Sequence, residues 1–207
     1  MSSEHKQGEN WKVLLIGGSS GVGKTVVSRE LSRRLSISLL LLDDVRLAIQ
    51  GVTSHETNPD LHVFLNYQEE QWRNAESIYA DWITVGNAML KPLQAIIHHH
   101  LIVPDVGPLI IEGDGILPGI TGPFIEPKVV STVFIVEPDE EQLLNNLRSR
   151  GRGFNEWNTP QQKGFAHASW LYGQWLAREA KQLDVPVIES QPQQTLSERL
   201  LASTGAK

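Results

Sequence analysis

The sequence predicts an α/β fold in which a five-stranded parallel sheet is flanked by helices. Along the 207 residues, short apolar runs alternate with stretches whose apolar residues recur at helical spacing, which is the pattern of a parallel sheet covered by helices. The runs are continuously apolar, as expected for strands buried on both faces. Hydrophobic residues make up 40% of the chain, enough for one core, so a single domain over residues 1–207 is expected. The predicted strands are residues 12–16, 38–42, 109–112, 129–137 and 185–188.

The first predicted strand is followed at once by a phosphate-binding motif of the form G-x-x-x-x-G-K-[ST]. The motif reads Gly18-Ser19-Ser20-Gly21-Val22-Gly23-Lys24-Thr25. In such a loop, glycines let backbone N–H groups approach the phosphates, the lysine neutralises the outer phosphates, and the final hydroxyl reaches Mg²⁺. The helix that must follow is indicated by apolar residues at helical spacing, Val26, Val27, Leu31 and Leu35. A P-loop NTPase fold that binds a nucleoside triphosphate is therefore expected.

The second predicted strand ends in two carboxylates, Asp43 and Asp44. Ligands of open α/β sheets bind at the carboxyl ends of the strands, so both groups are expected in the same crevice as the phosphate loop. A carboxylate there can orient or deprotonate a substrate hydroxyl for attack on the terminal phosphate. It can equally cap the next helix. Both roles, catalytic base and helix cap, therefore stay open for Asp43 and Asp44.

Residues 58–101 contain many helix formers and no clear strand, so we expect a helical insertion longer than an ordinary crossover. Aromatic residues within it, Trp82 among them, can line an acceptor pocket, although aromatic residues at helical spacing more often pack in a core. His62 and Arg73 are candidate contacts to the acceptor, with ordinary surface polarity as the alternative.

The third predicted strand ends in a second acidic segment, in which Glu112 and Asp114 are two residues apart. Side chains at this spacing lie on the same side of an extended chain. The alternative is a solvated Gly-Asp-Gly turn. A phosphate-loop enzyme uses an acidic group at a neighbouring strand end to bind Mg²⁺ directly or through water. We therefore expect Thr25, with Glu112 or Asp114, to hold Mg²⁺.

After the fourth strand and a helix, arginines alternate with small residues at Arg148, Arg150 and Arg152. This composition is typical of a cationic lid, here about residues 148–163, that closes over the phosphates. A helix C-terminus also favours cations, which accounts for the first two arginines more easily than for the third. We expect Arg148 and Arg152 to act on the reacting phosphate and Arg150 to bind the nucleotide.

Composition excludes several classes of protein and site. The net charge of −6 argues against a protein that binds nucleic acid electrostatically. The absence of cysteine excludes disulfides, thiolate chemistry and cysteine-ligated metals. The first ten residues are polar, and no apolar stretch approaches the roughly 20 residues of a membrane helix. A cytoplasmic protein with neither a membrane nor a nucleic-acid partner is expected, and its oligomeric state is left open.

With these four sites, the chain resembles the P-loop small-molecule kinases related to nucleoside monophosphate kinases, and most closely 2-phosphoglycerate kinase. Chloramphenicol phosphotransferase and zeta-toxin kinases are more distantly similar. The likeness extends from about residue 11 to about residue 200. It is carried by Gly17-Gly18-Ser19-Ser20-Gly21-Val22-Gly23-Lys24, Asp43-Asp44-Val45-Arg46, Leu61-His62, Glu112-Gly113-Asp114-Gly115-Ile116-Leu117-Pro118-Gly119 and Val185-Pro186-Val187-Ile188-Glu189.

The resemblance implies a central parallel sheet, ATP as the donor, and an acceptor hydroxyl activated by the acid that closes the second strand. By its position in this resemblance the acid is Asp43, with Asp44 as the alternative, and the resemblance implies that Arg46 points toward the acceptor. The resemblance also implies that the helical insertion supplies the acceptor pocket. The segment after Ile188 is then expected to border the adenine.

The chain departs from 2-phosphoglycerate kinases in one segment. Where those proteins look like Glu-Gly-Val-His, this chain has Glu112-Gly113-Asp114-Gly115. A histidine is lost and a carboxylate is gained beside the expected acceptor. Because the added negative charge repels a phosphorylated acid, a neutral acceptor, or one that carries an amine or hydroxyls, is favoured over 2-phosphoglycerate.

The sequence thus predicts an ATP- and Mg²⁺-dependent kinase for a small-molecule hydroxyl. A 2-phosphoglycerate-like acid, an antibiotic, a sugar or a nucleoside are the candidate acceptors. The alternative is a regulatory ATPase or nucleotide switch without a small-molecule acceptor, which the small size of the chain and Asp43 disfavour. A closed, polar-lined pocket facing Asp43 would favour the kinase, and a flat apolar outer face on the helical insertion would favour the switch.

Overall fold

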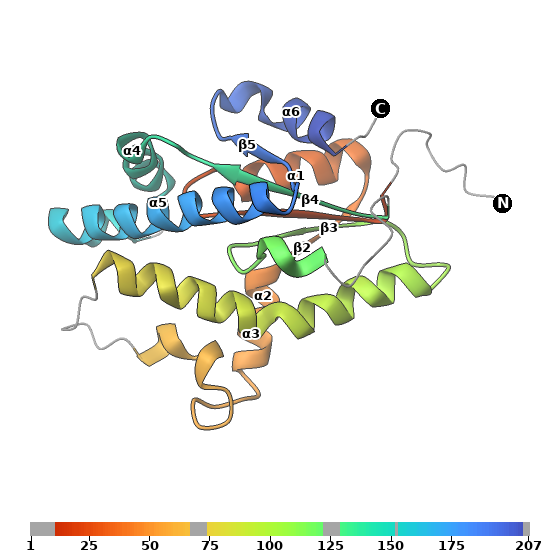
Figure 1. Ribbon diagram of the computed structural model, residues 1–207, viewed down its shortest axis with the longest axis horizontal. Coiled ribbons are helices and arrows are strands. Elements are labelled where there is room, and N and C mark those ends of the chain that lie inside the picture. Colours follow the sequence, from red (N-terminus) through yellow and green to blue (C-terminus); the bar gives the residue numbers. More distant parts are fainter. Residues whose placement is uncertain (1–10, 67–73, 122–128, 152, 205–207) are drawn as a thin grey trace.

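The computed structural model describes residues 11–66, 74–121, 129–151 and 153–204 (Figure 1). Its centre is a five-stranded, entirely parallel sheet in the order β2-β3-β1-β4-β5. The predicted sheet is therefore confirmed, and the predicted strand ends differ from the observed ones by at most two residues. The strands are β1 Val13–Gly18, β2 Ser38–Leu41, β3 Leu109–Glu112, β4 Val130–Val136 and β5 Val187–Glu189.

Helices cover both faces of the sheet. Along the central strand β1, alternate side chains enter different cores, because successive residues of a strand point to opposite faces. Val13 and Leu15 pack with α3 and α5, whereas Leu14 and Ile16 pack with α1, α4 and α6. Figure 1 shows α3 and α5 running beside each other, and they make the most extensive helix–helix contact of the fold. The helices are α1 Lys24–Leu35, α2 Leu42–Gln50, α3 Ala75–Ile102, α4 Glu140–Arg150, α5 Thr159–Gln182 and α6 Leu196–Ser203.

The long helices begin at side-chain caps that the sequence supplies. Asn74 accepts a hydrogen bond from the backbone N–H of Ser77 at the start of α3. At the start of α5, Asn158 and Gln161 form a reciprocal capping box. Each cap satisfies N–H groups that have no partner inside the helix.

The described part of the segment between α2 and β3 contains the 3₁₀ helices η1 Pro59–Leu61 and η2 Val63–Asn66, which precede α3. Leu61 and Met89 of this segment are buried in the same core as Val13 and Leu15. The segment therefore packs directly on the sheet. No helix in the described part of the chain is long and apolar enough to cross a membrane.

Candidate active site

The phosphate loop joins β1 to α1 and has a conformation that only glycine tolerates at several positions. Gly18 has φ +145°, and a Cβ there would lie 2.3 Å from the carbonyl oxygen of Ile135. Gly23, the N-cap of α1, has φ +91°. The loop thus wraps the N-terminus of a 12-residue helix, where unpaired N–H groups and the helix dipole favour a bound anion.

Lys24 of the loop lies beside the acid that follows β3. Its Nζ is 2.5 Å from Oδ1 of Asp114 and donates a hydrogen bond to the carbonyl oxygen of Ser19 at 2.8 Å. The hydroxyl of Ser20 donates to Oδ2 of Asp114 at 3.0 Å. The Tyr172 hydroxyl donates to the carbonyl oxygen of Asp114 at 2.5 Å. Asp114 is therefore held through both its carboxylate and its backbone.

Glu112, the last residue of β3, takes a different partner. Its Oε1 accepts a hydrogen bond from the Thr25 hydroxyl at 2.8 Å. Burial raises the pKa of Glu112, while the positive charge of Lys24 and the Thr25 hydrogen bond oppose the rise. Of the two acids in this segment, Asp114 thus contacts Lys24, and Glu112 contacts Thr25.

The oxygen atoms of Thr25 and Glu112 fit a magnesium ion. Mg²⁺ prefers hard oxygen ligands, and it commonly binds one or two carboxylates together with substrate phosphates and waters. Within the described ranges, no group of three or more acidic or histidine side chains could hold a metal alone. A magnesium site at Thr25 and Glu112 would consequently be completed by a nucleotide.

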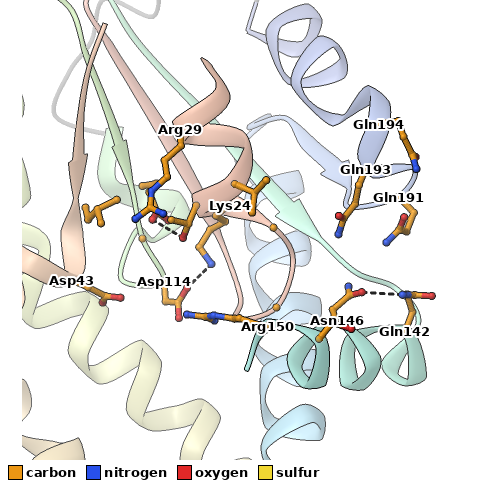
Figure 2. A pocket seen from close by; sticks show the side chains of 18 of the residues that line it. Lys24, Arg29, Asp43, Asp114, Gln142, Asn146, Arg150, Gln191, Gln193 and Gln194 are labelled. Carbon is orange, nitrogen blue, oxygen red and sulfur yellow. Dashed lines mark hydrogen bonds and ion pairs between the residues drawn. The ribbon is translucent and has the colours of Figure 1, made fainter. Parts of the chain in front are cut away.

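A cavity of about 930 Å³ opens beside the loop and is called here the nucleotide cavity (Figure 2). Lys24, Asp43 and Asp114 lie toward one side of it, and Arg150 extends into it from α4. On the opposite side Figure 2 shows a group of carboxamide side chains, from α4 and from the segment after β5. They are Gln142, Asn146, Gln191, Gln193 and Gln194.

The carboxamides offer hydrogen-bonding groups to a ligand. Gln142 Nε2 donates to Asn146 Oδ1 at 2.9 Å, and the buried Nδ2 of Asn146 has no partner among the described residues. A buried donor without a partner is costly, so this end of the cavity suits a ligand with acceptor atoms, such as a nucleobase. The three glutamines follow Ile188, in the segment expected to border the adenine.

A second cavity, of about 250 Å³, adjoins the first and is called here the acceptor cavity. Asp43 and Asp114 line both cavities. Arg46, one turn along α2, contacts Asp43 with Nη2 3.2 Å from Oδ1. The other described residues that line the acceptor cavity are Ser20, Leu42, Phe64, Trp82, Val85, Met89, Gly115 and Phe165.

The two strand-end aspartates have different surroundings. β2 ends at Leu41, which is also the N-cap of α2, and no side chain caps this helix. Asp43 and Asp44 therefore lie in the first turn of α2, and neither is its cap. Asp43 faces the cavities with its side chain 60% exposed, whereas Asp44 is exposed and lines neither cavity.

Two other sequence-derived candidates lie away from both cavities. His62 is buried, with Nε2 3.0 Å from the Thr53 hydroxyl. Arg148 donates from Nε to Oε1 of Gln162 at 3.0 Å, which ties α4 to α5. The candidates Arg73 and Arg152 lie outside the described residues.

Sequence reasoning missed the carboxamide group and most of the acceptor-cavity wall. Of the apolar and aromatic wall residues, only Trp82 was a candidate, and core packing was its favoured role. The sequence did carry a signal for the carboxamides, since Gln191-Pro192-Gln193-Gln194 begins two residues after the last strand, at the sheet edge where ligands bind. Phe64 and Phe165 carry no comparable local signal.

No protein-family model matches the chain. Among curated proteins, it is similar to 2-phosphoglycerate kinase of Pyrococcus horikoshii, with 28% identity over 184 residues, and to 2-phosphoglycerate kinase of Thermococcus kodakarensis, with 23% over 182 residues. Each alignment covers 86% of this chain but only 59% and 60% of the respective relatives. The chain therefore spans about three fifths of the length of these relatives.

Solved structures with the same fold include shikimate kinase from Acinetobacter baumannii in complex with shikimate, with a TM-score of 0.53, 18% identity, and coverage of 93% of this chain and 92% of that one. A gluconokinase from Sinorhizobium meliloti 1021 aligns with a TM-score of 0.51 and 12% identity, over 94% of this chain and 91% of that one. At these identities the likeness concerns the fold. The chain thus has the fold of the P-loop kinases, and its sequence is similar to 2-phosphoglycerate kinases, as its motifs predict.

Proposed function

We propose that this chain is a kinase that transfers the γ-phosphoryl group of ATP, with Mg²⁺, to a hydroxyl of a small molecule. The observation that carries the proposal is that two adjoining cavities share Asp43 and Asp114. One cavity contains the phosphate loop, and the other is large enough for a small acceptor. Phosphoryl transfer needs this arrangement, because donor and acceptor must meet in line at one point.

The nucleotide would lie along the larger cavity. The loop N–H groups and Lys24 bind the phosphates, and the carboxamides at the far side receive the base. This orientation directs the terminal phosphate toward Asp43 and Asp114, which lie on the side of the cavity opposite the carboxamides (Figure 2) and also line the acceptor cavity. Arg150 lines the same cavity and supplies positive charge near the phosphates, as the predicted lid requires.

Thr25 and Glu112 would hold Mg²⁺ together with the nucleotide. When bound, the ion neutralises charge on the β- and γ-phosphate oxygens. Glu112 is positioned for this by its place at the end of β3 and by the Thr25 hydrogen bond. Lys24 is paired with Asp114 and not with Glu112, so a bound nucleotide must draw the lysine away from Asp114.

Asp43 would handle the acceptor hydroxyl. The acceptor oxygen attacks the γ-phosphorus, and the new O–P bond forms as the bond to the β,γ-bridging oxygen breaks. ADP departs with the bonding electron pair, and the hydroxyl proton passes to the Asp43 carboxylate. The Arg46 contact fixes the orientation of this carboxylate.

The acceptor cavity also supports a kinase over a nucleotide-driven switch without a small-molecule acceptor. A switch needs no second cavity next to the terminal phosphate. The cavity differs in one respect from the sequence expectation, because its wall is largely apolar, with the polar groups gathered at the Asp43 and Asp114 end. This distribution of groups bears on the identity of the acceptor.

The test is ADP release by the purified protein with ATP and Mg²⁺ across a panel of hydroxylated small molecules, including 2-phosphoglycerate, sugars, nucleosides and aminoglycoside or phenicol antibiotics. ADP release that requires an acceptor and is lost in Lys24→Ala supports the kinase. Hydrolysis that no acceptor accelerates, or tight ATP binding without turnover, would instead support the switch. Phosphorylated product detected by mass spectrometry identifies the acceptor class.

A further inference from the structure

We infer that the acceptor is an alcohol carried on an aromatic or other apolar ring, and that it bears no phosphate or carboxylate group. The inference rests on the proposed function, since it concerns the same site. It follows from three properties of the described lining of the acceptor cavity: an aromatic wall, a polar end confined to the phosphate side, and a deficit of positive charge.

The aromatic wall is centred on Trp82 of α3. Its ring lies 5.3 Å from that of Phe165 in an edge-to-face arrangement, 5.6 Å from that of Tyr172 in a stacked arrangement, and 6.2 Å from that of Phe64 (centroid distances). These spacings are those of favourable aromatic pairs. Trp82 is nevertheless only half-buried and lines the cavity. The ring is thus held rigidly by its neighbours while part of it faces the cavity.

Apolar side chains extend this wall. Val85 and Met89 lie one and two turns beyond Trp82 on α3, and Leu42 of α2 also contributes to the cavity lining. At about 250 Å³, the cavity is slightly smaller than the roughly 300–1,000 Å³ typical of sites for drug-sized ligands. A single ring with a short substituent matches both the size and the surface of this space.

The polar groups lie at the end that adjoins the nucleotide cavity. Asp43 and Asp114 are shared between the two cavities, and Ser20 of the phosphate loop lies beside them. An acceptor would therefore direct its hydroxyl toward these acids and its apolar body toward Trp82. This division is unsuited to a molecule that is polar over its whole surface, such as a sugar, because buried polar groups require partners.

The charge balance opposes an anionic acceptor. Among the described residues that line the acceptor cavity, Arg46 is the only cation, and it is already paired with Asp43. Asp114 is paired with Lys24, and a bound phosphate would draw that lysine away. A carboxylate or phosphate on the acceptor would then face two acids and one paired arginine, whereas an amine would be attracted, also by the face of Trp82.

Three compounds with the same ring and the same benzylic hydroxyl separate these effects: 1-phenyl-1,2-ethanediol, 2-amino-1-phenylethanol and mandelate. With ATP and Mg²⁺, the diol and the amino alcohol should accelerate ADP release with kcat/KM at least about tenfold above mandelate and 2-phosphoglycerate. Equal or faster transfer to mandelate or 2-phosphoglycerate would overturn the inference.

A tryptophan pair in the chain provides matched variants. Trp82 and Trp175 both stack on Tyr172 and are both half-buried, but only Trp82 lines the acceptor cavity. Trp82→Leu should raise the KM for the diol about tenfold, and Trp82→Phe should restore most of the loss. Trp175→Leu should leave this KM unchanged. An equal effect of both leucine variants would mean that the aromatic cluster acts only through stability, and would overturn the role of Trp82.

Calorimetric titration of the diol into the nucleotide-free protein separates failure of this inference from failure of the proposed function. Binding that is weakened by Trp82→Leu, without any transfer, supports the ligand class and contradicts the kinase. Transfer to 2-phosphoglycerate alone supports the kinase and contradicts the ligand class. The absence of both binding and transfer for all three phenyl compounds overturns the inference.

Discussion

Nζ of Lys24 lies 2.5 Å from Oδ1 of Asp114, and the two side chains are only 7% and 22% exposed. The phosphate-loop lysine is thus paired with a carboxylate of its own chain. A buried cation without a partner is costly, so Asp114 stabilises the loop. ATP must then compete with Asp114 for the lysine. The negative charge of Asp114 therefore opposes the binding of the phosphate.

Asp114→Asn should therefore tighten ATP binding in the absence of Mg²⁺ and destabilise the empty protein. Removing the competing carboxylate frees Lys24 and removes repulsion of the phosphate, an effect of about tenfold in Kd. The empty protein loses the partner of a buried lysine and should unfold at a lower temperature. Calorimetric titration with ATP and EDTA, together with thermal unfolding with and without ATP, measures both effects.

Asp44→Asn is the matched control for this experiment, because it removes the same charge from an exposed position that lines neither cavity. It should change the Kd for ATP by less than about twofold, as expected for an exposed charge. Weaker ATP binding by Asp114→Asn under these conditions would show that Asp114 assists the phosphate instead of opposing it.

Asp43→Asn should abolish phosphoryl transfer while ATP binding stays nearly intact. Loss of a general base typically costs about 10²- to 10⁴-fold in rate, and the mutated side chain contacts Arg46 but no residue of the phosphate loop. Asp44→Asn should retain full activity. Steady-state kinetics and ATP titration on both variants provide the measurement. Loss of both transfer and ATP binding in Asp43→Asn would contradict the role of Asp43 as the base for the acceptor hydroxyl.

Glu112→Gln should change the pH dependence of both stability and activity. Burial raises the pKa of Glu112 above its ordinary value of 4.5, so the folded protein binds this proton more readily than the unfolded chain does. The free energy of unfolding should then fall as pH rises from 4.5 through the raised pKa. Glutamine keeps the oxygen that accepts from Thr25 but carries no charge, so this pH dependence should disappear.

The same variant should lose Mg²⁺-dependent activity by about 10- to 100-fold at neutral pH, the range seen when metal-site groups are altered. In the wild-type protein, activity should fall as the pH is lowered and Glu112 becomes protonated. Because the pKa of Glu112 is raised, this fall should occur at a higher pH than for a glutamate with the ordinary pKa. Thermal unfolding from pH 4 to 8 without Mg²⁺ tests the predicted pH dependence of stability. ADP release measured against Mg²⁺ concentration tests the predicted loss of Mg²⁺-dependent activity. Unchanged Mg²⁺ dependence would move the metal site to Asp114.

Tyr172→Phe should destabilise the protein through the backbone of Asp114. The Tyr172 side chain is fully buried, and its hydroxyl donates to the Asp114 carbonyl oxygen at 2.5 Å. Leaving this carbonyl without its partner costs about 1 to 3 kcal/mol, and each kcal/mol corresponds to about 2 to 4 °C in Tm for a chain of this size. Differential scanning calorimetry measures the shift, and an unchanged Tm would mean that water replaces the hydroxyl.

The strands and the phosphate loop were predictable because each depends on a local pattern. Val13-Leu14-Leu15-Ile16 reads as a buried strand, and the glycine spacing from Gly18 to Lys24 has few structural interpretations. The acids that follow β2 and β3 were predictable as site residues because parallel strands end at the same edge. Thr25 was expected to act with either Glu112 or Asp114, and in the structure its hydroxyl donates a hydrogen bond to Glu112.

Other parts of the site depend on contacts between distant residues. Ser20 meets Asp114 across 94 positions of the chain, Tyr172 meets it across 58, and Ser169 meets Ser20 across 149. A local pattern carries no information on such pairs. For this reason the sequence left Asp43 and Asp44 as alternatives. Because α2 begins at Leu42, Asp43 lines the cavities, whereas Asp44 points to solvent.

The parallel α/β sheet, the phosphate loop and the acids at the neighbouring strand ends can be read from the amino-acid sequence, because hydrophobic periodicity and glycine geometry act over a few residues. The pairing of Asp114 with Lys24, and the single wall formed by Phe64, Trp82 and Phe165 from three helices, depend on how the elements pack. The physical reason is that a cavity is made of surfaces left uncovered when helices pack, and packing joins residues whose separation along the chain has no bearing on their distance in space.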